Sequence, residues 1–276
     1  MAKIIDGKAH AQTLKNGLKE WIANHNKNVT LVIFQAGDNP ASNVYVRNKQ
    51  KACEEIGIES KVMKVDTPAE LRYHIAFQSS FCDAMMVQLP LPEEFGDPQQ
   101  YIDLIPPAKD ADCLTTYNLG KLFLGDDTLA PCTAAGIMDL LAQEGIDVCG
   151  KHAVVVGRSD IVGKPVAHML LAKDATVTVC HSRTKNLADF TRMADILVVA
   201  IGKPKFITED MVKEGAVVID VGINRMEDGK LCGDVDFDAV KDKASAITPV
   251  PGGVGPMTVA ELLANAVYCA EVLNNE

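Results

Sequence analysis

The sequence lacks the hydrophobic segments that membrane-bound or secreted proteins carry. It has no apolar run of about 18 or more residues, and its first residues, Met-Ala-Lys-Ile-Ile-Asp-Gly-Lys, contain no apolar signal region. A helix that crosses a bilayer needs about 20 predominantly apolar residues. We therefore expect no membrane partner and a cytoplasmic location.

Cysteine pairs with metal-binding or redox spacing are also missing. The eight cysteines are scattered along the chain, and no two of them are spaced as C-x-x-C. Zinc sites and redox-active dithiols commonly use that spacing. The sequence therefore predicts no metal site, and reduced thiols fit the expected cytoplasmic location.

Positive charge is in deficit, because the formal net charge of the 276 residues is -10. Proteins that bind nucleic acid usually present a basic face, so we expect no nucleic-acid partner. An anionic ligand must instead be held by local donors. Apolar residues make up 47% of the chain, which is enough for the core of one large domain or two modest ones.

The stretch 153–165 has the plan of a nucleotide-binding βα turn, although the fingerprint G-x-G-x-x-G is absent. Val154–Val156 predict a buried parallel strand, Gly157 ends it, and an apolar helical pattern follows Gly163. Free N–H groups and the helix dipole at such a turn favour an anion. An ordinary βα turn of an α/β domain is the alternative interpretation.

The next predicted strand, 175–180, ends without the carboxylate that NAD enzymes often place there. Ser182 and Arg183 follow it, and Arg158 lies in the preceding βα turn. A hydroxyl and guanidinium groups suit a 2′-phosphate, because charge-assisted hydrogen bonds are strong and Arg binds bidentately. The sequence thus favours NADP over NAD, although solvated loop residues would give the same pattern.

Strands and helices alternate along the chain, which predicts two α/β units with largely parallel sheets. We expect helices at 8–25, at 42–56 with Ser42 as the N-cap, and at 208–213. Leu119 to Leu129 is interpreted as loop or short extended pieces. Residues 249–256 form a predicted connector before a helix from Met257 to about Asn274. The expected strands span 29–34, 60–65, 83–89, 153–157, 175–180, 195–201, 216–221 and 246–248.

Six blocks, found in the family's order over almost the whole chain, resemble the bifunctional methylenetetrahydrofolate dehydrogenase/cyclohydrolases. The Pro/Gly-rich block is the most distinctive of them. The blocks are Y-V-R-N-K at 45–49, V-Q-L-P-L-P at 87–92, K-D-A-D at 109–112, G-R-S-D-I-V-G at 157–163, D-V-G-I-N at 220–224 and P-V-P-G-G-V-G-P-M-T at 249–258.

The resemblance implies two α/β domains, a folate-binding N-terminal domain and a Rossmann-like NADP-binding domain, with an interdomain cleft. It assigns residues 1–133 and 257–276 to the folate-binding catalytic domain and residues 134–256 to the NADP domain. It also implies a homodimer and two reactions of one-carbon metabolism, which serve purine biosynthesis. NADP oxidises 5,10-methylenetetrahydrofolate to the 5,10-methenyl cation, and water then converts that cation to 10-formyltetrahydrofolate.

The resemblance implies that Lys49 handles the proton in the hydrolysis. An ordinary lysine titrates near ~10.4, so this role requires burial or a neighbouring cation. Gln88 would orient Lys49 without adding charge. Tyr45, one helical turn before Lys49, would stack on the folate, and Asp112 would accept hydrogen bonds from the pterin. Without the resemblance, a snorkelling lysine, a strand end and a turn aspartate are the plainer interpretations.

The remaining implied site residues divide between cofactor and substrate. For NADP the resemblance points to Gly157, Arg158, Ser159, Ser182, Arg183 and Ile223. For the folate it adds Leu89, Pro251, Gly252 and Gly253 to Tyr45, Gln88 and Asp112.

Two positions depart from the family's pattern. Cys113 stands where the family usually has Gly, and its side chain could shift the loop of Asp112 if the position needs a positive φ. Ala134 replaces a Pro near a helix start, which should cost little.

Another two-domain NADP enzyme, of the shikimate or amino-acid dehydrogenase type, is disfavoured, because Tyr45, Lys49 and Gln88 together do not suit such an enzyme. A catalytically silent NADP-binding protein is disfavoured because the set of reactive side chains is intact. A family member with a single activity remains open.

Overall fold

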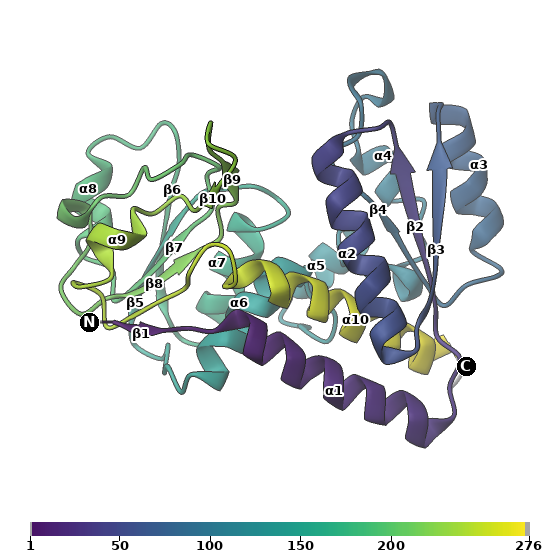
Figure 1. Cartoon of the computed structure of the whole chain (residues 1–276), viewed down its shortest axis with the longest axis horizontal. Coiled ribbons are helices and arrows are strands. Elements are labelled where there is room, and N and C mark those ends of the chain that lie inside the picture. The colour runs from purple at the N-terminus through teal and green to yellow at the C-terminus, as the bar shows by residue number, and fades with distance from the viewer. Residues whose placement is uncertain (1, 274–276) are drawn as a thin grey trace. The chain divides into compact units, whose positions relative to one another are not determined.

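The computed structural model of the chain describes residues 2–273 (Figure 1), and they divide into two compact units. The large-sheet unit contains the residues up to Ala11 and Thr133–Thr258. The small-sheet unit contains Gln12–Cys132 and the described residues from Val259 onward. The predicted folate-binding domain includes all of residues 1–133, whereas in the structure the residues up to Ala11 belong to the large-sheet unit.

The large-sheet unit is built on six parallel strands in the order β1-β11-β8-β7-β5-β6. β5 and β7 are interior strands and are almost entirely apolar and buried, as strands covered on both faces require. β1 joins the edge because Ile4 pairs with Ile247, and this pairing was not predicted. The strands are β1 Lys3–Ile4, β5 His152–Val156, β6 Thr176–Cys180, β7 Ile196–Val199, β8 Val217–Asp220 and β11 Ala246–Ile247.

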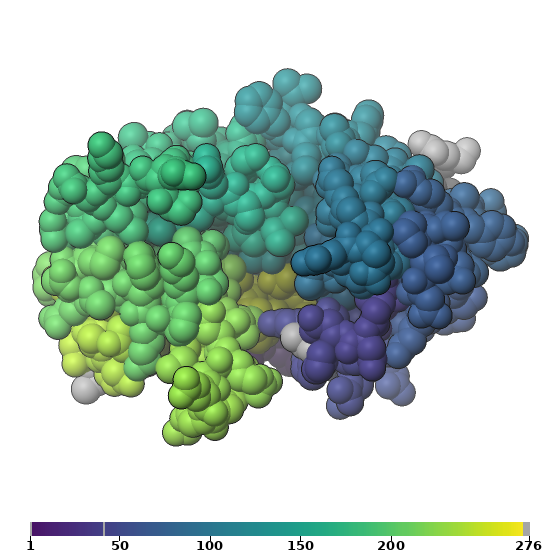
Figure 2. Space-filling view, turned by 90° about the horizontal axis from the view of Figure 1, so that it is seen from above, coloured from purple at the N-terminus to yellow at the C-terminus, as the bar shows by residue number. Residues whose placement is uncertain are grey.

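Short helices connect these strands. The predicted helix 208–213 is wrong, because only the 3-10 turn η3, Glu209–Met211, forms there. An antiparallel hairpin, β9 Asn224–Arg225 with β10 Leu231–Cys232, was also not predicted. Residues 225–230 of this hairpin are exposed and stand out from the surface in yellow-green (Figure 2). The helices are α6 Cys132–Gln143, α7 Gly163–Ala172, α8 Leu187–Thr191 and α9 Phe237–Val240.

The small-sheet unit has three parallel strands in the order β3-β2-β4. Leu31 and Ile33 of β2 are fully buried in one hydrophobic cluster, and Val32 and Phe34 point to the opposite face into another. This alternation lets helices cover both faces of a parallel sheet. The elements are α1 Gly7–His25, β2 Thr30–Ala36, α2 Pro40–Ile56, β3 Glu59–Val65, α3 Pro68–Gln78 and β4 Ala84–Val87.

Two local predictions in this unit are wrong. α2 begins at Pro40, so Ser42 lies inside the helix, and the Ser42 N–H donates to Asn39 Oδ1 at 3.3 Å. Leu119 to Leu129 is not all loop, because Thr115 caps a helix by accepting from the Asn118 N–H. The remaining elements here are η1 Glu93–Phe95, α4 Gln99–Ile102, η2 Pro107–Lys109 and α5 Thr116–Phe123.

The last helix, α10 Val254–Leu273, starts three residues earlier than predicted and includes Gly255 and Pro256 in its first turn. Pro is tolerated there because the first N–H groups of a helix have no partner within it. Asn274, the predicted end, lies outside the described residues. One side of this helix is buried in the same hydrophobic cluster as Leu31 and Ile33, through Leu262, Leu263, Ala266, Val267, Cys269 and Ala270.

Candidate active site

Lys49 and Gln88 meet at the carboxyl edge of the small sheet. β2 lies between β3 and β4, so the connections that leave β2 and β3 run to opposite sides, and ligands collect where this happens. Lys49 lies on α2, which follows β2, and Gln88 directly follows β4. Lys49 Nζ donates to Gln88 Oε1 at 3.0 Å. The predicted pair is therefore brought together across 39 residues of sequence.

Lys49 Nζ contacts two uncharged groups. The side chains of both Lys49 and Gln88 are buried, with each residue 8% exposed. Besides Gln88, Lys49 Nζ contacts Met86 Sδ at 3.4 Å. The Gln88 amide is itself fixed, because its Nε2 donates to the carbonyl of Leu89 at 2.7 Å. An amine held by an amide oxygen and a thioether is oriented without the charge of a carboxylate.

Tyr45 is 39% exposed and lies one turn before Lys49 on α2. Partial burial raises the pKa of the Tyr45 hydroxyl above its usual value. The phenol therefore stays neutral at physiological pH, and its exposed ring is available to an aromatic ligand.

Asp112 lies in a turn whose backbone is strongly held. The buried Asp110 carboxylate accepts from the N–H groups of Leu114 at 3.2 Å and Thr115 at 2.8 Å. Asp112 Oδ1 lies 3.5 Å from Cys132 Sγ. Cys113, the departure from the family's Gly, has φ +55° and is fully buried. The position does use the left-handed region, so this chain accepts a strained non-glycine residue beside Asp112.

The other departure, Ala134, is fully buried near the start of α6. The helix begins at Cys132 without a proline, as expected from the low cost of that change.

In the large-sheet unit, Gly157 lies at the corresponding point of the sheet. It directly follows β5, and β5 lies between β6 and β7, where the connections diverge. Gly157 has φ +130°, and a Cβ there would lie 2.3 Å from the carbonyl oxygen of Ala200, which follows β7. A Cβ on Gly163 would lie 2.4 Å from the carbonyl oxygen of Gly157. Both glycines are therefore required for the tight turn that leads into α7.

Three predicted cofactor residues have exposed side chains around this turn: Arg158, Ser182 and Arg183. Ser182 and Arg183 form the tip of a turn after β6, closed by a hydrogen bond from the Thr184 N–H to the His181 carbonyl at 2.8 Å. Because β5 and β6 are paired up to Val156 and Cys180, the two turns follow neighbouring strand ends. Their donors thus face solvent at one edge of the sheet.

Ser159 is also exposed, and its Oγ accepts from the Gly163 N–H at 3.3 Å. The serine therefore satisfies the first N–H of α7 and still presents its hydroxyl proton near the helix N-terminus.

The roles of two buried aspartates at this edge were not predicted from the sequence, although Asp220 begins the block 220–224. Asp234 accepts from the backbone N–H groups of Ile201 at 2.7 Å, Gly202 at 2.9 Å and Lys203 at 2.7 Å. Its Oδ1 also accepts from Asn224 Nδ2 at 2.9 Å. Asp234 thereby ties the loop after β7 to the β9 strand. The block G-D-V-D at 233–236 offered only a weak signal, because aspartate is common in turns.

Asp220, at the end of β8, accepts from the N–H groups of Gly222 at 3.0 Å, Asp234 at 2.9 Å and Val235 at 2.9 Å. Burial raises the pKa of the Asp220 carboxyl to about 7, although these backbone donors oppose the shift. Asp220 thus fixes the start of the loop that carries Ile223, whose side chain is 41% exposed.

The Pro/Gly-rich segment passes over the start of α1 within the large-sheet unit. The Lys8 N–H donates to the Gly252 carbonyl at 3.1 Å. Gly252 and Gly253 are buried, and Pro251 is exposed after a cis peptide bond. Of the predicted folate residues, Pro251, Gly252 and Gly253 therefore belong to the large-sheet unit, whereas Tyr45, Gln88, Leu89 and Asp112 belong to the small-sheet unit.

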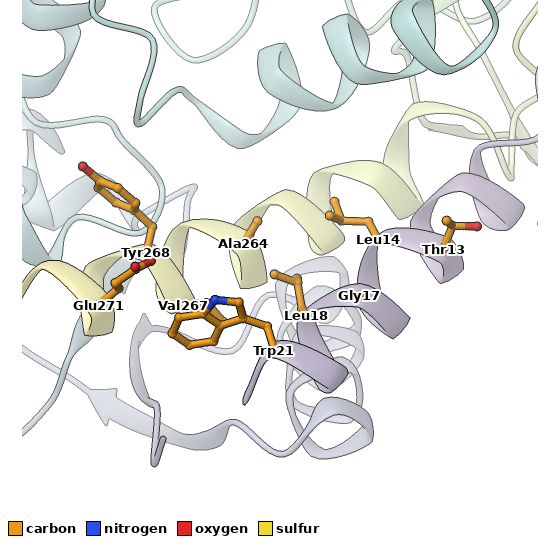
Figure 3. Close-up of a pocket in the computed structure, with 9 residues that line it drawn as sticks. All are labelled: Thr13, Leu14, Gly17, Leu18, Trp21, Ala264, Val267, Tyr268 and Glu271. Atoms are coloured by element: carbon orange, nitrogen blue, oxygen red, sulfur yellow. The ribbon is translucent and has the colours of Figure 1, made fainter. Parts of the chain in front are cut away.

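A groove of about 450 Å³ lies elsewhere in the small-sheet unit, between α1 and α10 (Figure 3). Leu14, Leu18 and Trp21 face it from α1, and Val267 and Tyr268 from α10. None of the predicted site residues lines this groove. Within residues 2–273 there is no group of three potential metal ligands and no helix long and apolar enough to cross a membrane.

Comparison with known proteins assigns both parts of the chain to one family. Residues 5–112 match the catalytic domain of tetrahydrofolate dehydrogenase/cyclohydrolase, and residues 131–274 match its NAD(P)-binding domain. The chain belongs to the tetrahydrofolate dehydrogenase/cyclohydrolase family. The family predicted from the six sequence blocks is thus confirmed.

Relatives and solved structures agree with this family over the full length. The bifunctional protein FolD of Magnetococcus marinus is 51% identical, with 100% of this chain and 99% of the relative covered. FolD of Bacillus subtilis is 50% identical, with 98% of each covered. The FolD crystal structure from Campylobacter jejuni has a TM-score of 0.95 at 45% identity and covers 99% of this chain and 100% of its own.

A second structure bears on the cofactor. The Trypanosoma brucei dehydrogenase-cyclohydrolase, complexed with NADP and an inhibitor, has a TM-score of 0.95 at 38% identity and covers 100% of this chain and 99% of its own. The comparisons confirm the predicted two-domain α/β class, the bifunctional dehydrogenase and cyclohydrolase activity, and the NADP cofactor of this tetrahydrofolate dehydrogenase/cyclohydrolase.

Proposed function

We propose that Lys49, Gln88, Tyr45 and Asp112 carry the folate chemistry of this enzyme. The observation that supports this most is the buried hydrogen bond of 3.0 Å between Lys49 and Gln88 at the carboxyl edge of the small sheet. Family membership supplies the substrates, 5,10-methylenetetrahydrofolate for the dehydrogenase and the methenyl cation for the cyclohydrolase. The chemical roles follow from the surroundings of each side chain.

Lys49 handles the proton of the hydrolysis. Water adds to the methenyl carbon of the cation, forms the C–O bond and must lose a proton as the ring opens to the formyl product. An amine next to an amide and a thioether can accept that proton when the cationic substrate lies nearby, because a like charge disfavours the ammonium form. Gln88 orients Lys49 through its fixed amide.

Tyr45 and Asp112 hold the folate in this proposal. The exposed ring of Tyr45 stacks on the flat ring system of the ligand. The Asp112 carboxylate accepts hydrogen bonds from the pterin's N–H donors, and Leu89 adds apolar contact. For the hydride step these contacts supply alignment, because a positioned pair of reactants needs no protein acid or base.

The large-sheet unit has the features needed to hold NADP. The close approach of Gly157, Ala200 and Gly163 leaves only backbone beside the N-terminus of α7, where a pyrophosphate is favoured. Ser159 adds a hydroxyl donor there. Arg158, Ser182 and Arg183 provide exposed donors at neighbouring strand ends for the 2′-phosphate. NADP supplies the hydride acceptor, and we assign Ile223, Pro251, Gly252 and Gly253 to ligand contacts at the same sheet edge.

The cytoplasmic location, the homodimer and the link to purine biosynthesis stay predictions. Size-exclusion chromatography with light scattering tests the homodimer directly.

Replacing the proposed proton carrier tests the site. Lys49→Met keeps a side chain of similar length and removes the amine, so hydrolysis of methenyltetrahydrofolate should fall by about 10²-fold or more. The Kd for NADP, measured by fluorescence titration, should stay within about twofold. Lys51→Met, an exposed lysine on the same helix, is the matched control and should retain activity. Near-wild-type hydrolysis by Lys49→Met would show that Lys49 is not the proton carrier.

A further inference from the structure

One side chain near the C-terminus holds the segment that carries Asp112. Asn265 lies on α10 and is only 7% exposed. Its Nδ2 donates to the carbonyl of Ala111 at 2.8 Å and to the carbonyl of Ala130 at 3.1 Å. An amide NH₂ has two donors, so Asn265 uses both of them to join two segments that are distant in sequence.

The second member of this network is Cys132, at the start of α6. The residue is 3% exposed. Its Sγ lies 3.3 Å from the Ala111 carbonyl oxygen, 3.5 Å from Asp112 Oδ1 and 3.6 Å from Asn265 Nδ2. Burial, with the Asp112 carboxylate adding to it, raises the pKa of the Cys132 thiol well above its usual value. The thiol therefore stays protonated, and its single S–H is shared between the Ala111 carbonyl and Asp112 Oδ1.

The backbone on either side of Asp112 is fixed by other contacts. The Ala111 N–H donates to the Met85 carbonyl at 3.1 Å, and Asp110 holds Leu114 and Thr115. The Asp112 carboxylate itself is contacted by Cys132, whose Sγ lies 3.5 Å from Oδ1. A donor at Oδ1 restricts the rotation of the carboxylate while Oδ2 remains available to a ligand.

We propose that Asn265 and Cys132 are positioning residues that set the direction of the Asp112 carboxylate for the folate substrate. The proposal rests on the proposed role of Asp112 in binding folate. Asn265 holds the Ala111 carbonyl and lies against Cys132, and Cys132 in turn donates to Asp112. Neither side chain belongs to the six sequence blocks that carry the resemblance to the family.

The test compares two replacements of Cys132. Cys132→Ala removes the donor, and Cys132→Ser keeps an O–H donor in nearly the same place. For Cys132→Ala and for Asn265→Ala we expect the KM for methenyltetrahydrofolate to rise roughly tenfold. Cys132→Ser should stay within about threefold of wild type. The Kd for NADP should not change in any of them, because the contacts of Asn265 and Cys132 lie within the small-sheet unit.

Cys82→Ala is the matched control. Cys82 is 6% exposed in the same unit, and its thiol also donates to a backbone carbonyl, that of Gln78 at 3.2 Å. This variant should lose stability in thermal unfolding and keep the wild-type KM for folate. An equal rise of KM in Cys82→Ala and Cys132→Ala would mean that loss of a buried thiol acts only through stability, which would overturn the proposal.

Asp112→Asn separates failure of this inference from failure of the proposed function. If Asp112→Asn raises the KM for folate and the Cys132 and Asn265 variants do not, the positioning network is wrong and the role of Asp112 stands. If Asp112→Asn leaves KM unchanged, the role of Asp112 is wrong and the inference falls with it. If the network acts through Asp112, Cys132→Ala should add less than about twofold to the KM of Asp112→Asn. Should Asn265→Ala not fold, the Ala and Ser variants of Cys132 decide the outcome.

Discussion

The two sheets have different groups at the same topological position, backbone in the large sheet and side chains in the small sheet. In the large sheet, the point between β5 and β7 is made of backbone, because Gly157 at φ +130° lies against the Ala200 carbonyl and leaves no room for a side chain. In the small sheet, the point between β2 and β4 carries the buried side chains of Lys49 and Gln88. The first arrangement admits a ligand close to the main chain, and the second presents functional groups.

This difference follows the chemistry that each unit serves. A dinucleotide brings its own reactive group, so the protein needs space and N–H donors. The hydrolysis needs a proton carrier that the folate does not supply, so side chains must be present. Substitutions at each point can separate these two requirements.

Adding a side chain at Gly157, the backbone position in the large sheet, should have the largest effect, which is a loss of stability. Gly157→Ala adds a Cβ that would meet the Ala200 carbonyl and forces alanine into a positive φ, so the free energy of unfolding should fall by about 3 kcal/mol. Urea unfolding measures this loss. Gly150→Ala is the control, because Gly150 has φ +69° and no atom within 4 Å of an added Cβ, and it should cost only about 1 kcal/mol. Equal losses would show that the close approach to Ala200 is unimportant.

Placing a negative charge at Gln88 in the small sheet should have the next largest effect, which is a shift in the pH profile of the hydrolysis. Gln88→Glu would place a carboxylate about 3 Å from Lys49 Nζ, in the position of the present amide oxygen. An opposite charge at that distance stabilises the ammonium form, so the pH at which cyclohydrolase activity rises should increase by about 1 to 3 units. The pH profile of methenyltetrahydrofolate hydrolysis checks this, with Gln88→Met as the uncharged control. An unshifted profile in Gln88→Glu would contradict a proton-carrying role for Lys49.

The buried carboxylate of Asp220 should give a smaller, pH-dependent effect on stability. Its pKa of about 7 lies above that of an unfolded aspartate, so its contribution to stability is fully present below about pH 4 and is lost as pH rises through 7. Asp220→Asn should flatten the dependence of the unfolding free energy on pH between 4 and 7, by up to about 1.4 kcal/mol per unit.

Asp126→Asn is the control of opposite sign for this experiment. Lys121 lowers the pKa of the Asp126 carboxyl to about 2, so its contribution is lost only as pH falls below about 4. This variant should keep the wild-type dependence of the unfolding free energy on pH between pH 5 and 7 in the same urea titrations, although its unfolding free energy is lower throughout that range. A wild-type slope in Asp220→Asn would mean that Asp220 is already ionised throughout that range.

Restoring the family's glycine should have the smallest effect. Cys113→Gly relieves a positive φ, worth about 1 kcal/mol, but removes a fully buried side chain of similar value. The free energy of unfolding should therefore change by less than about 1 kcal/mol, and the KM for folate should remain near wild type. A large gain in either activity would show that Cys113 distorts the loop of Asp112.

Much of the fold was predictable because it depends on local patterns. The valine run 154–156 and the apolar run around 196–199 identified central strands correctly. The helix 116–123 was missed because it is short and begins in an irregular region, where its Thr115 cap is not distinctive. β1 was missed because two residues carry no periodicity, and Lys3 pairs with Ala246, which is 243 positions further along the chain.

By itself the sequence determined the alternation of strands and helices, the positions of the tight glycine turn and the residue types available for chemistry. Those properties depend on side-chain identity and on neighbours along the chain. Only the tertiary structure decided three hydrogen bonds. Lys49 donates to Gln88, Asp234 accepts from the loop after β7, and Asn265 donates to the Ala111 carbonyl beside Asp112. The partners in these hydrogen bonds lie 39, 33 and 154 positions apart in the sequence. Which donors and acceptors meet across such separations is set by the packing of whole elements, and no local pattern records it.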